Sequence, residues 1–130
     1  MLDFINPKIV AGVQILAAVG IARFWMTWLR TEHKEPWLPT GYVEHERCFV
    51  YPDSVLATLM VISAILLFIG NPLGQRLTLV CGGTMLFLTV IDTAYLLQNG
   101  MFSREKGGGE NVPLILVLAV VSLLMILRFL

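Results

Sequence analysis

The sequence predicts an all-α membrane protein, a polytopic four-transmembrane-helix bundle that forms a single membrane domain over residues 1–130. Hydrophobic residues make up 57% of the chain and charged residues only 14%, whereas soluble domains average about 45–50% and about 25%. The apolar residues are also concentrated in four blocks, at 9–29, 54–70, 77–97 and 112–130, each close to the ~20 residues that cross a bilayer. A soluble fold needs a polar shell that so few charges cannot supply.

Each predicted helix is bounded by recognisable start and stop residues. The four helices are expected at residues 8–30, 53–70, 74–98 and 112–130, and a polar loop over 31–52 joins the first two. Asn6 followed by Pro7 is a typical beginning for the first helix, because Asn caps free amides and Pro needs no donor in the first turn. Asp53 and Ser54 are expected to cap the second helix in the same way.

The later helix ends follow the same logic. The Gly-Asn-Pro segment at 70–72 is expected to end the second helix, with a short link over 73–76 that turns the chain back. Asn99 followed by Gly100 is typical of a helix C-terminus and ends the third helix. Pro113 is expected in the first turn of the last helix.

The order of the helices predicts which segments share a side of the membrane. An even number of spans places both termini on one side and the loops 31–52 and 99–111 on the other. Lys and Arg residues set orientation in membranes, and five lie at the loop end while three lie at the terminal end. These are Arg30, Lys34, Arg47, Arg104 and Lys106 at the loops, and Lys8, Arg76 and Arg128 near the termini. This excess of basic residues favours a cytoplasmic location for the two loops. The zero net charge of the chain argues against a nucleic-acid partner.

Two charged residues lie well inside the predicted spans, Arg23 in the first and Asp92 in the third. A charge in a span by default marks a function or a pairing. Since the two helices run in the same direction and both residues lie at equal depth, we predict that Arg23 and Asp92 face each other as an ion pair. The first and third helices should then meet or share an internal cavity, with Gly82 and Gly83 allowing a close approach. Alternatively, each charge reaches the headgroups separately. Gln14, on the other side of the first helix, should bond to a different helix.

Polar and aromatic residues gather at the predicted loop end and suggest a binding cavity there. Trp37, between Pro36 and Pro39, could fold the 31–52 loop over the mouth of the bundle, beside Asp92 and Tyr95. A polar cavity with aromatic walls is a typical ligand site. The candidate ligand-binding residues are Arg23, Thr27, Arg30, Trp37, Tyr51, Asp92, Tyr95, Gln98 and Asn99.

Histidines and carboxylates in the 31–52 loop raise the question of metal binding or acid–base chemistry. The spacing around His33 and His45 matches no established ligand motif, so neither a bound metal nor another cofactor is expected. His45, Glu46 and Asp53 could supply general acid–base groups. The chain has no nucleophile elbow, phosphate-binding loop, CxxC pair or HExxH motif.

These features lead to three candidate functions. The leading hypothesis is a non-enzymatic binder, carrier or accessory subunit that holds a lipid-like, amphipathic or anionic small ligand near Arg23 and Asp92. The second is a small membrane enzyme that acts on a lipid headgroup through His45, Glu46 and Asp53. The third is a structural subunit of a larger membrane complex. The expected partners are the lipid bilayer and either further copies of the chain or a partner membrane subunit.

Overall fold

The computed structural model describes residues 1–130 and is entirely helical. Its elements are α1 (Pro7–Trp28), α2 (Tyr42–Arg47), α3 (Val50–Phe68), α4 (Pro72–Gln98), the 3-10 turn η1 (Arg104–Lys106) and α5 (Gly108–Phe129). Four helical segments are long and apolar enough to cross a membrane: α1, the segment from α2 through α3, α4 and α5. The predicted all-α class and the four apolar helices are therefore confirmed.

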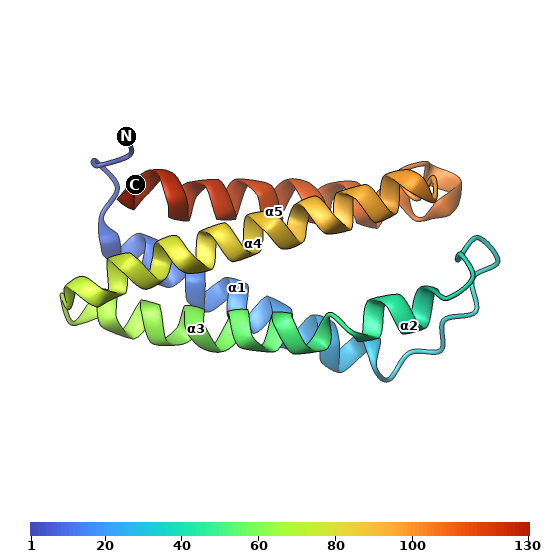
Figure 1. The fold of residues 1–130 in the computed structure, drawn as a ribbon, viewed down its shortest axis with the longest axis horizontal. Helices are drawn as coiled ribbons and strands as arrows, with labels where there is room; N and C mark the ends of the chain where they lie inside the picture. The colour runs from blue at the N-terminus through green and yellow to red at the C-terminus, as the bar shows by residue number, and fades with distance from the viewer.

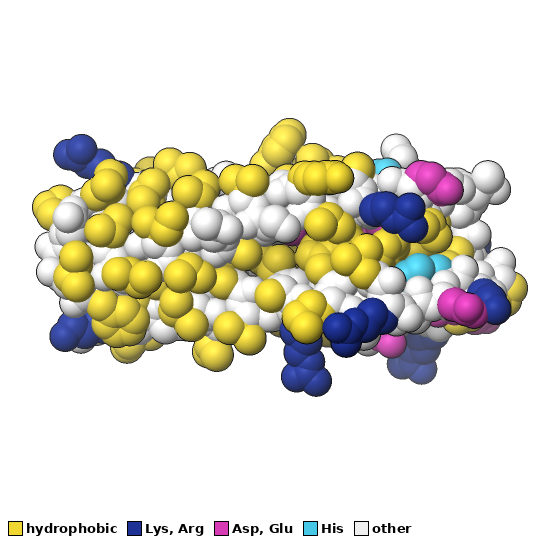
Figure 2. All heavy atoms as spheres, turned by 90° about the horizontal axis from the view of Figure 1, so that it is seen from below, with side chains coloured by type: hydrophobic (Ala, Val, Ile, Leu, Met, Phe, Trp, Pro, Cys, Tyr) yellow, Lys and Arg dark blue, Asp and Glu magenta, His cyan; other side chains and the backbone are white.

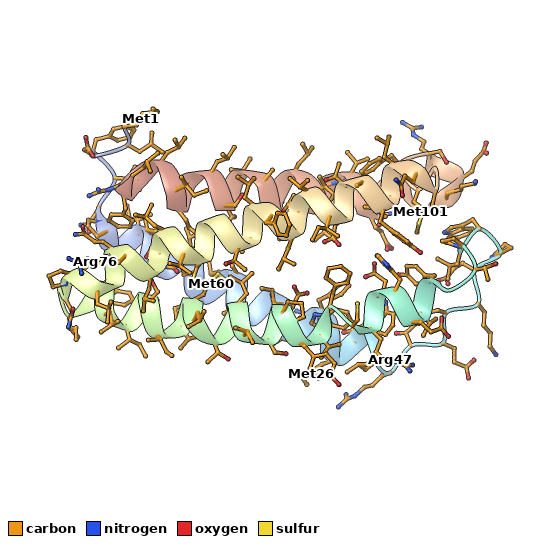
Figure 3. All side chains as sticks on the ribbon, viewed as in Figure 1. Met1, Met26, Arg47, Met60, Arg76 and Met101 are labelled. Carbon is orange, nitrogen blue, oxygen red and sulfur yellow. The ribbon has the colours of Figure 1, made fainter.

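The long helices are arranged as two neighbouring pairs (Figure 1). Helix α1 packs along α3, α5 packs along α4, and α3 packs against α4. The two pairs lie close together at the end that holds both chain termini and the α3–α4 link, and they diverge toward the opposite end, where α2 lies. Figure 3 marks these ends by Met1 and Arg76 on one side and by Arg47 and Met101 on the other. We call them the terminal end and the loop end.

Polar hydrogen bonds tie three of the helices together within the core. Gln14 of α1 donates to the hydroxyl groups of Ser63 on α3 and Thr78 on α4, at 3.4 and 3.1 Å. All three side chains are fully buried, and both hydroxyls also lie within hydrogen-bond distance of the Gly74 carbonyl. Gln14 was predicted to bond a helix other than the third span; it does bond Ser63 of the second span, but its shorter bond is to Thr78 of the third.

The predicted packing of the first helix against the third is wrong. Helix α1 has α3 as its neighbour, and the Gln14–Thr78 bond is its only hydrogen bond to α4. Gly82, expected to face the first helix, instead faces α5, where an added Cβ would lie 2.9 Å from Ile126 and 3.1 Å from Met125. Gly83 has open space around it.

The helix ends agree with the sequence in part. Asn6 accepts a hydrogen bond from the Lys8 amide, and α4 ends before Asn99 and a left-handed Gly100, as predicted. Asp53 caps no helix, because α3 begins three residues earlier at Val50.

Two further boundaries differ from the expected ones. Helix α4 begins at Pro72, capped by Asn71, so residues 73–76 belong to the helix and not to a link. Helix α5 begins at Gly108 after a left-handed Gly107, which places Pro113 beyond the first turn.

The surface of the molecule is strongly apolar between its two ends (Figure 2). Hydrophobic side chains cover much of the visible face, while acidic and histidine side chains gather toward the loop end. Large exposed side chains on all four long helices, such as Leu16, Ile65, Phe87 and Val120, contribute to this surface. Such a surface is unfavourable in water and suits a hydrocarbon environment.

Candidate functional site

The short helix α2 lies at the loop end, where it contacts α4. His45 of α2 stacks on Tyr95 of α4, with ring centroids 3.8 Å apart and planes only 9° from parallel. On its other side the His45 ring contacts Phe49, at 5.3 Å between centroids. The polar loop after α1 therefore folds back into the space between the two helix pairs.

Three carboxylates on three different helices lie toward the loop end. Glu46 of α2, Asp53 of α3 and Asp92 of α4 are all partly buried. We call Glu46, Asp53, Asp92 and the adjacent His45 and Tyr95 the loop-end cluster.

Tryptophans of α1 form the wall behind the loop-end cluster. The Trp25 indole donates a 2.9 Å hydrogen bond to a carboxylate oxygen of Asp53. One turn later, Trp28 donates a longer bond of 3.4 Å to the Tyr42 hydroxyl, and the two indoles meet edge to face. His33 lies beside the Trp28 ring, and its Nε2 is 3.0 Å from the Trp28 carbonyl oxygen. The tryptophans thus join α1 to the cluster and to the loop above it.

No basic side chain neutralises the loop-end cluster. The ion pairs of the structure join Asp3 to the N-terminus and to Arg128, and Glu32 to Lys34. Partly buried carboxylates without a cationic partner are costly in their charged form. Holding three of them in one place therefore favours the uptake of positive charge.

Glu46 belongs to the polar helix α2, which precedes the apolar stretch of α3. Its side chain is half-buried and forms no ion pair, an environment that disfavours the charged form of a carboxyl group.

His45 contributes an unused polar atom to the same place. Its Nε2 is buried and has no hydrogen-bond partner. A buried imidazole nitrogen without a partner is free to accept or donate a proton. No three His, Cys, Asp or Glu side chains are grouped so that they could hold a metal ion together.

The structure separates the two charges that we predicted to pair. Arg23 is exposed on the outer face of α1 and forms no ion pair, while Asp92 belongs to the loop-end cluster. The predicted Arg23–Asp92 contact is therefore wrong. Equal depth in the bundle does not bring two residues together when their helices are not neighbours.

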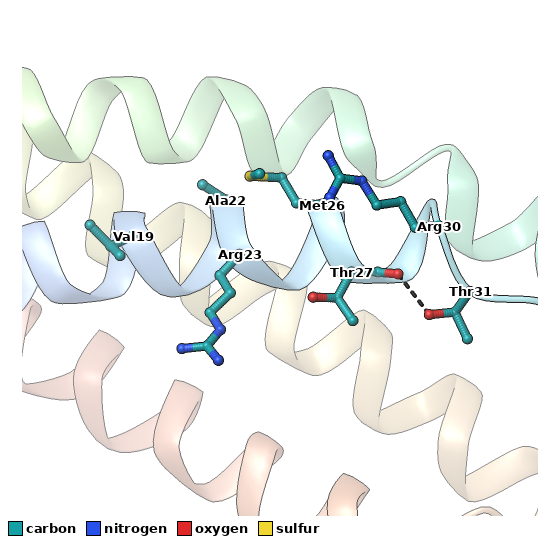
Figure 4. Close-up of a pocket in the computed structure, with 7 residues that line it drawn as sticks. All are labelled: Val19, Ala22, Arg23, Met26, Thr27, Arg30 and Thr31. Carbon is teal, nitrogen blue, oxygen red and sulfur yellow. Dashed lines mark hydrogen bonds between the residues drawn. The ribbon is translucent and has the colours of Figure 1, made fainter.

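Arg23 instead lines a different feature, an open groove on the outside of α1 with a volume of about 480 Å³ (Figure 4). We call it the α1 groove. Its lining residues are Val19, Ala22, Arg23, Met26, Thr27, Arg30 and Thr31. Three of the predicted ligand-binding residues, Arg23, Thr27 and Arg30, thus come together there.

The remaining predicted site residues are divided between the loop end and the surface. Trp37 lies against Gly107, so the 31–52 loop reaches across to the loop between α4 and α5, as its Pro-flanked position suggested. Asn99 donates its side-chain amide to the Tyr95 carbonyl and helps to end α4. Tyr51 and Gln98 are exposed and contact neither the cluster nor the groove by hydrogen bonds.

Sequence analysis did not single out Trp25, whose indole bonds Asp53 of the loop-end cluster. The signal was present in the spacing, because Trp25 and Trp28 continue the helical face that begins with Gln14 and Ala18. All four side chains are buried against α3 or the loop. A tryptophan on a buried face needs a partner for its N–H, and Asp53 provides one.

No family model, no curated protein sequence and no solved structure matches this chain.

Proposed function

We propose that the protein is a multi-pass membrane protein, a proton-linked carrier or an accessory subunit of one, and that the loop-end cluster is its proton-binding site. The observation that carries this proposal is the placement of Glu46, Asp53 and Asp92, three partly buried carboxylates without a basic partner, at the same end of the bundle. The apolar surface and the four long helices support the membrane location. Charged groups inside membrane segments are expensive and commonly belong to proton or ion pathways.

A proton is the cation that suits this cluster best. The carboxylates do not form a group that could hold a metal ion, whereas a proton needs no cavity and binds to a single carboxyl group. We therefore assign proton uptake to Glu46 and Asp92, with Asp53 held in place by Trp25.

Proton binding would be coupled to the position of α2. When Glu46 and Asp92 are both charged, their repulsion acts between α2 and α4, which the stack of His45 on Tyr95 holds together. Protonation removes this repulsion and stabilises the closed loop end. Loss of the proton favours an open mouth between the two helix pairs. Such a two-state change is what a proton-linked carrier or sensor requires.

The proposal is tested by infrared titration of the carboxyl groups in protein reconstituted into phosphatidylcholine nanodiscs. We expect a protonated carboxyl band that disappears as the pH is raised in the wild type, and a weaker band in the Glu46→Gln variant, in which only Asp92 remains to take up the proton. Glu44→Gln is the matched control, because Glu44 is an exposed glutamate on the same short helix. An unchanged titration in Glu46→Gln, or the same loss in both variants, would overturn the assignment.

A second function is favoured by the position of His45. It rests on the three residues that the sequence offers as acid–base candidates, His45 and Glu46 of α2 and Asp53 of α3. This arrangement suits a small membrane enzyme that acts on a lipid headgroup. Incubation with defined phospholipids and mass spectrometry of the products would test it. Turnover that is lost in His45→Ala and kept in Arg23→Leu would favour the enzyme over the carrier.

A further inference from the structure

We propose that the α1 groove binds the headgroup of an anionic phospholipid, with the phosphate held by Arg23, Thr27 and Arg30. This inference rests on the membrane location in the proposed function but not on the loop-end cluster. Five of the lining residues, from Val19 to Thr27, recur at intervals of three and four along α1 and share one face of the helix, and Arg30 and Thr31 follow just beyond its C-terminus. That face points away from α3, against which the opposite face of α1 packs.

The polarity of the α1 groove changes along the helix in the order that a lipid requires. Val19, Ala22 and Met26 supply apolar surface toward the middle of α1, and Arg30 and Thr31 follow at its loop end. A phospholipid places its acyl chains toward the middle of the bilayer and its phosphate toward the surface. The groove offers complementary surfaces to both parts in the same order.

The two arginines leave the centre of the groove open between them (Figure 4). Arg23 extends to one side of α1 and Arg30 to the other, with Thr27 between them. They are seven residues apart, or about 10 Å along the helix axis, a span that two long, flexible side chains can bridge. Thr31 donates its hydroxyl to the carbonyl oxygen of Thr27. The Thr27 hydroxyl is not used in that bond and adds a hydrogen-bond donor to the groove.

Nothing else in the chain neutralises Arg23 and Arg30. Neither forms an ion pair, and α1 contains no aspartate or glutamate. A phosphodiester supplies the missing negative charge and accepts two parallel hydrogen bonds from a guanidinium group. This charge complementarity selects an anionic lipid over a zwitterionic one.

The other occupants fit the α1 groove less well. A second copy of the chain, placed symmetrically on this face, would bring arginines against arginines with no carboxylate on α1 to separate them. A free phosphate ion would leave Val19, Ala22 and Met26 uncovered. The anionic phospholipid alone satisfies both the charged and the apolar halves.

The test measures retention of lipid by native mass spectrometry after detergent extraction from vesicles of equal parts phosphatidylglycerol and phosphatidylcholine. We expect the wild type to retain phosphatidylglycerol preferentially, and Arg23→Gln with Arg30→Gln to lower its retention about tenfold or more, since each charged hydrogen bond contributes substantially. Arg104→Gln with Lys106→Gln is the matched control, because it removes two exposed charges from the α4–α5 loop. The control should retain the lipid.

Three outcomes would overturn the proposal. One is equal retention of the two lipids by the wild type, and another is an equal loss in the groove and control variants. The third is full displacement by soluble glycerol phosphate, which would indicate a free-phosphate site. The carboxyl titration of Glu46 in the Arg23→Gln, Arg30→Gln variant verifies the fold and separates the two proposals. If the lipid is retained but Glu46 does not titrate, only the proton-site proposal fails. If Glu46 titrates but neither lipid is preferred, only the lipid-site proposal fails.

Discussion

The imidazole of His45 lies flat on the ring of Tyr95, 3.8 Å between centroids, and this stack joins α2 to α4 across the diverging end of the bundle. The contact connects the polar loop after α1 to the α4–α5 pair. Because Glu46 follows His45 directly, the stack also places the Glu46 carboxyl group near Asp92. The geometry of the candidate site therefore depends on this one pair of rings.

Removing the ring of Tyr95 should release α2. An aromatic pair contributes about 0.5–1.5 kcal/mol beyond the area that it buries, so Tyr95→Ala should raise amide hydrogen exchange over residues 42–49 severalfold. Tyr95→Phe keeps the ring and should leave the exchange unchanged. If Tyr95→Ala exchanges at the rate of the wild type, the stack does not hold α2 in place.

The buried hydrogen bond between Gln14 and Thr78 should contribute measurably to stability. Hydrogen bonds between membrane helices contribute about 0.6 kcal/mol on average and up to about 1.7 kcal/mol, so Gln14→Leu and Thr78→Val should each destabilise. The double variant should lose less than the sum of the two. Thr84→Val is the control, since Thr84 bonds its own helix in the same way but is exposed. Additive losses would show that the two side chains are not coupled.

The adjacent glycines of α4 should respond oppositely to substitution. A Cβ at Gly82 would lie 2.9 Å from Ile126 and 3.2 Å from the Ser122 carbonyl oxygen, so Gly82→Ala must displace α5. Overpacking of this kind costs about 1–3 kcal/mol. Gly83→Ala meets open space and should be neutral or slightly stabilising. Thermal unfolding should give a lower melting temperature for Gly82→Ala than for Gly83→Ala. Equal melting temperatures would mean that α4 and α5 do not pack at Gly82.

Substitutions at Arg23 and Asp92 should be additive. The two residues lie on helices that are not neighbours, and they form no ion pair. In a double-mutant cycle with Arg23→Gln and Asp92→Asn, the interaction energy should stay within about 0.3–0.5 kcal/mol of zero. A larger coupling in detergent unfolding would restore the ion pair that sequence analysis predicted.

The sequence by itself determined the four helices and several of their ends. The length and the apolar content of a helix depend only on the local sequence. The same is true of the cap at Asn6 and of the helix end at Asn99. The interhelical bond of Gln14 was also predictable, because a polar side chain on an apolar helix must find a partner. The short helix α2 was not, since a segment of six residues is too short to show a clear periodicity.

Only the tertiary structure decided which helices are neighbours, and with that where the site lies. The sequence places Arg23 and Asp92 at the same depth, but depth along the bundle axis does not specify the order of the helices around it. That order brought α1 beside α3 and left Arg23 facing outward. It also gathered Glu46, Asp53 and Asp92 from three helices, because contacts between distant segments depend on complementary packing surfaces that no local pattern encodes.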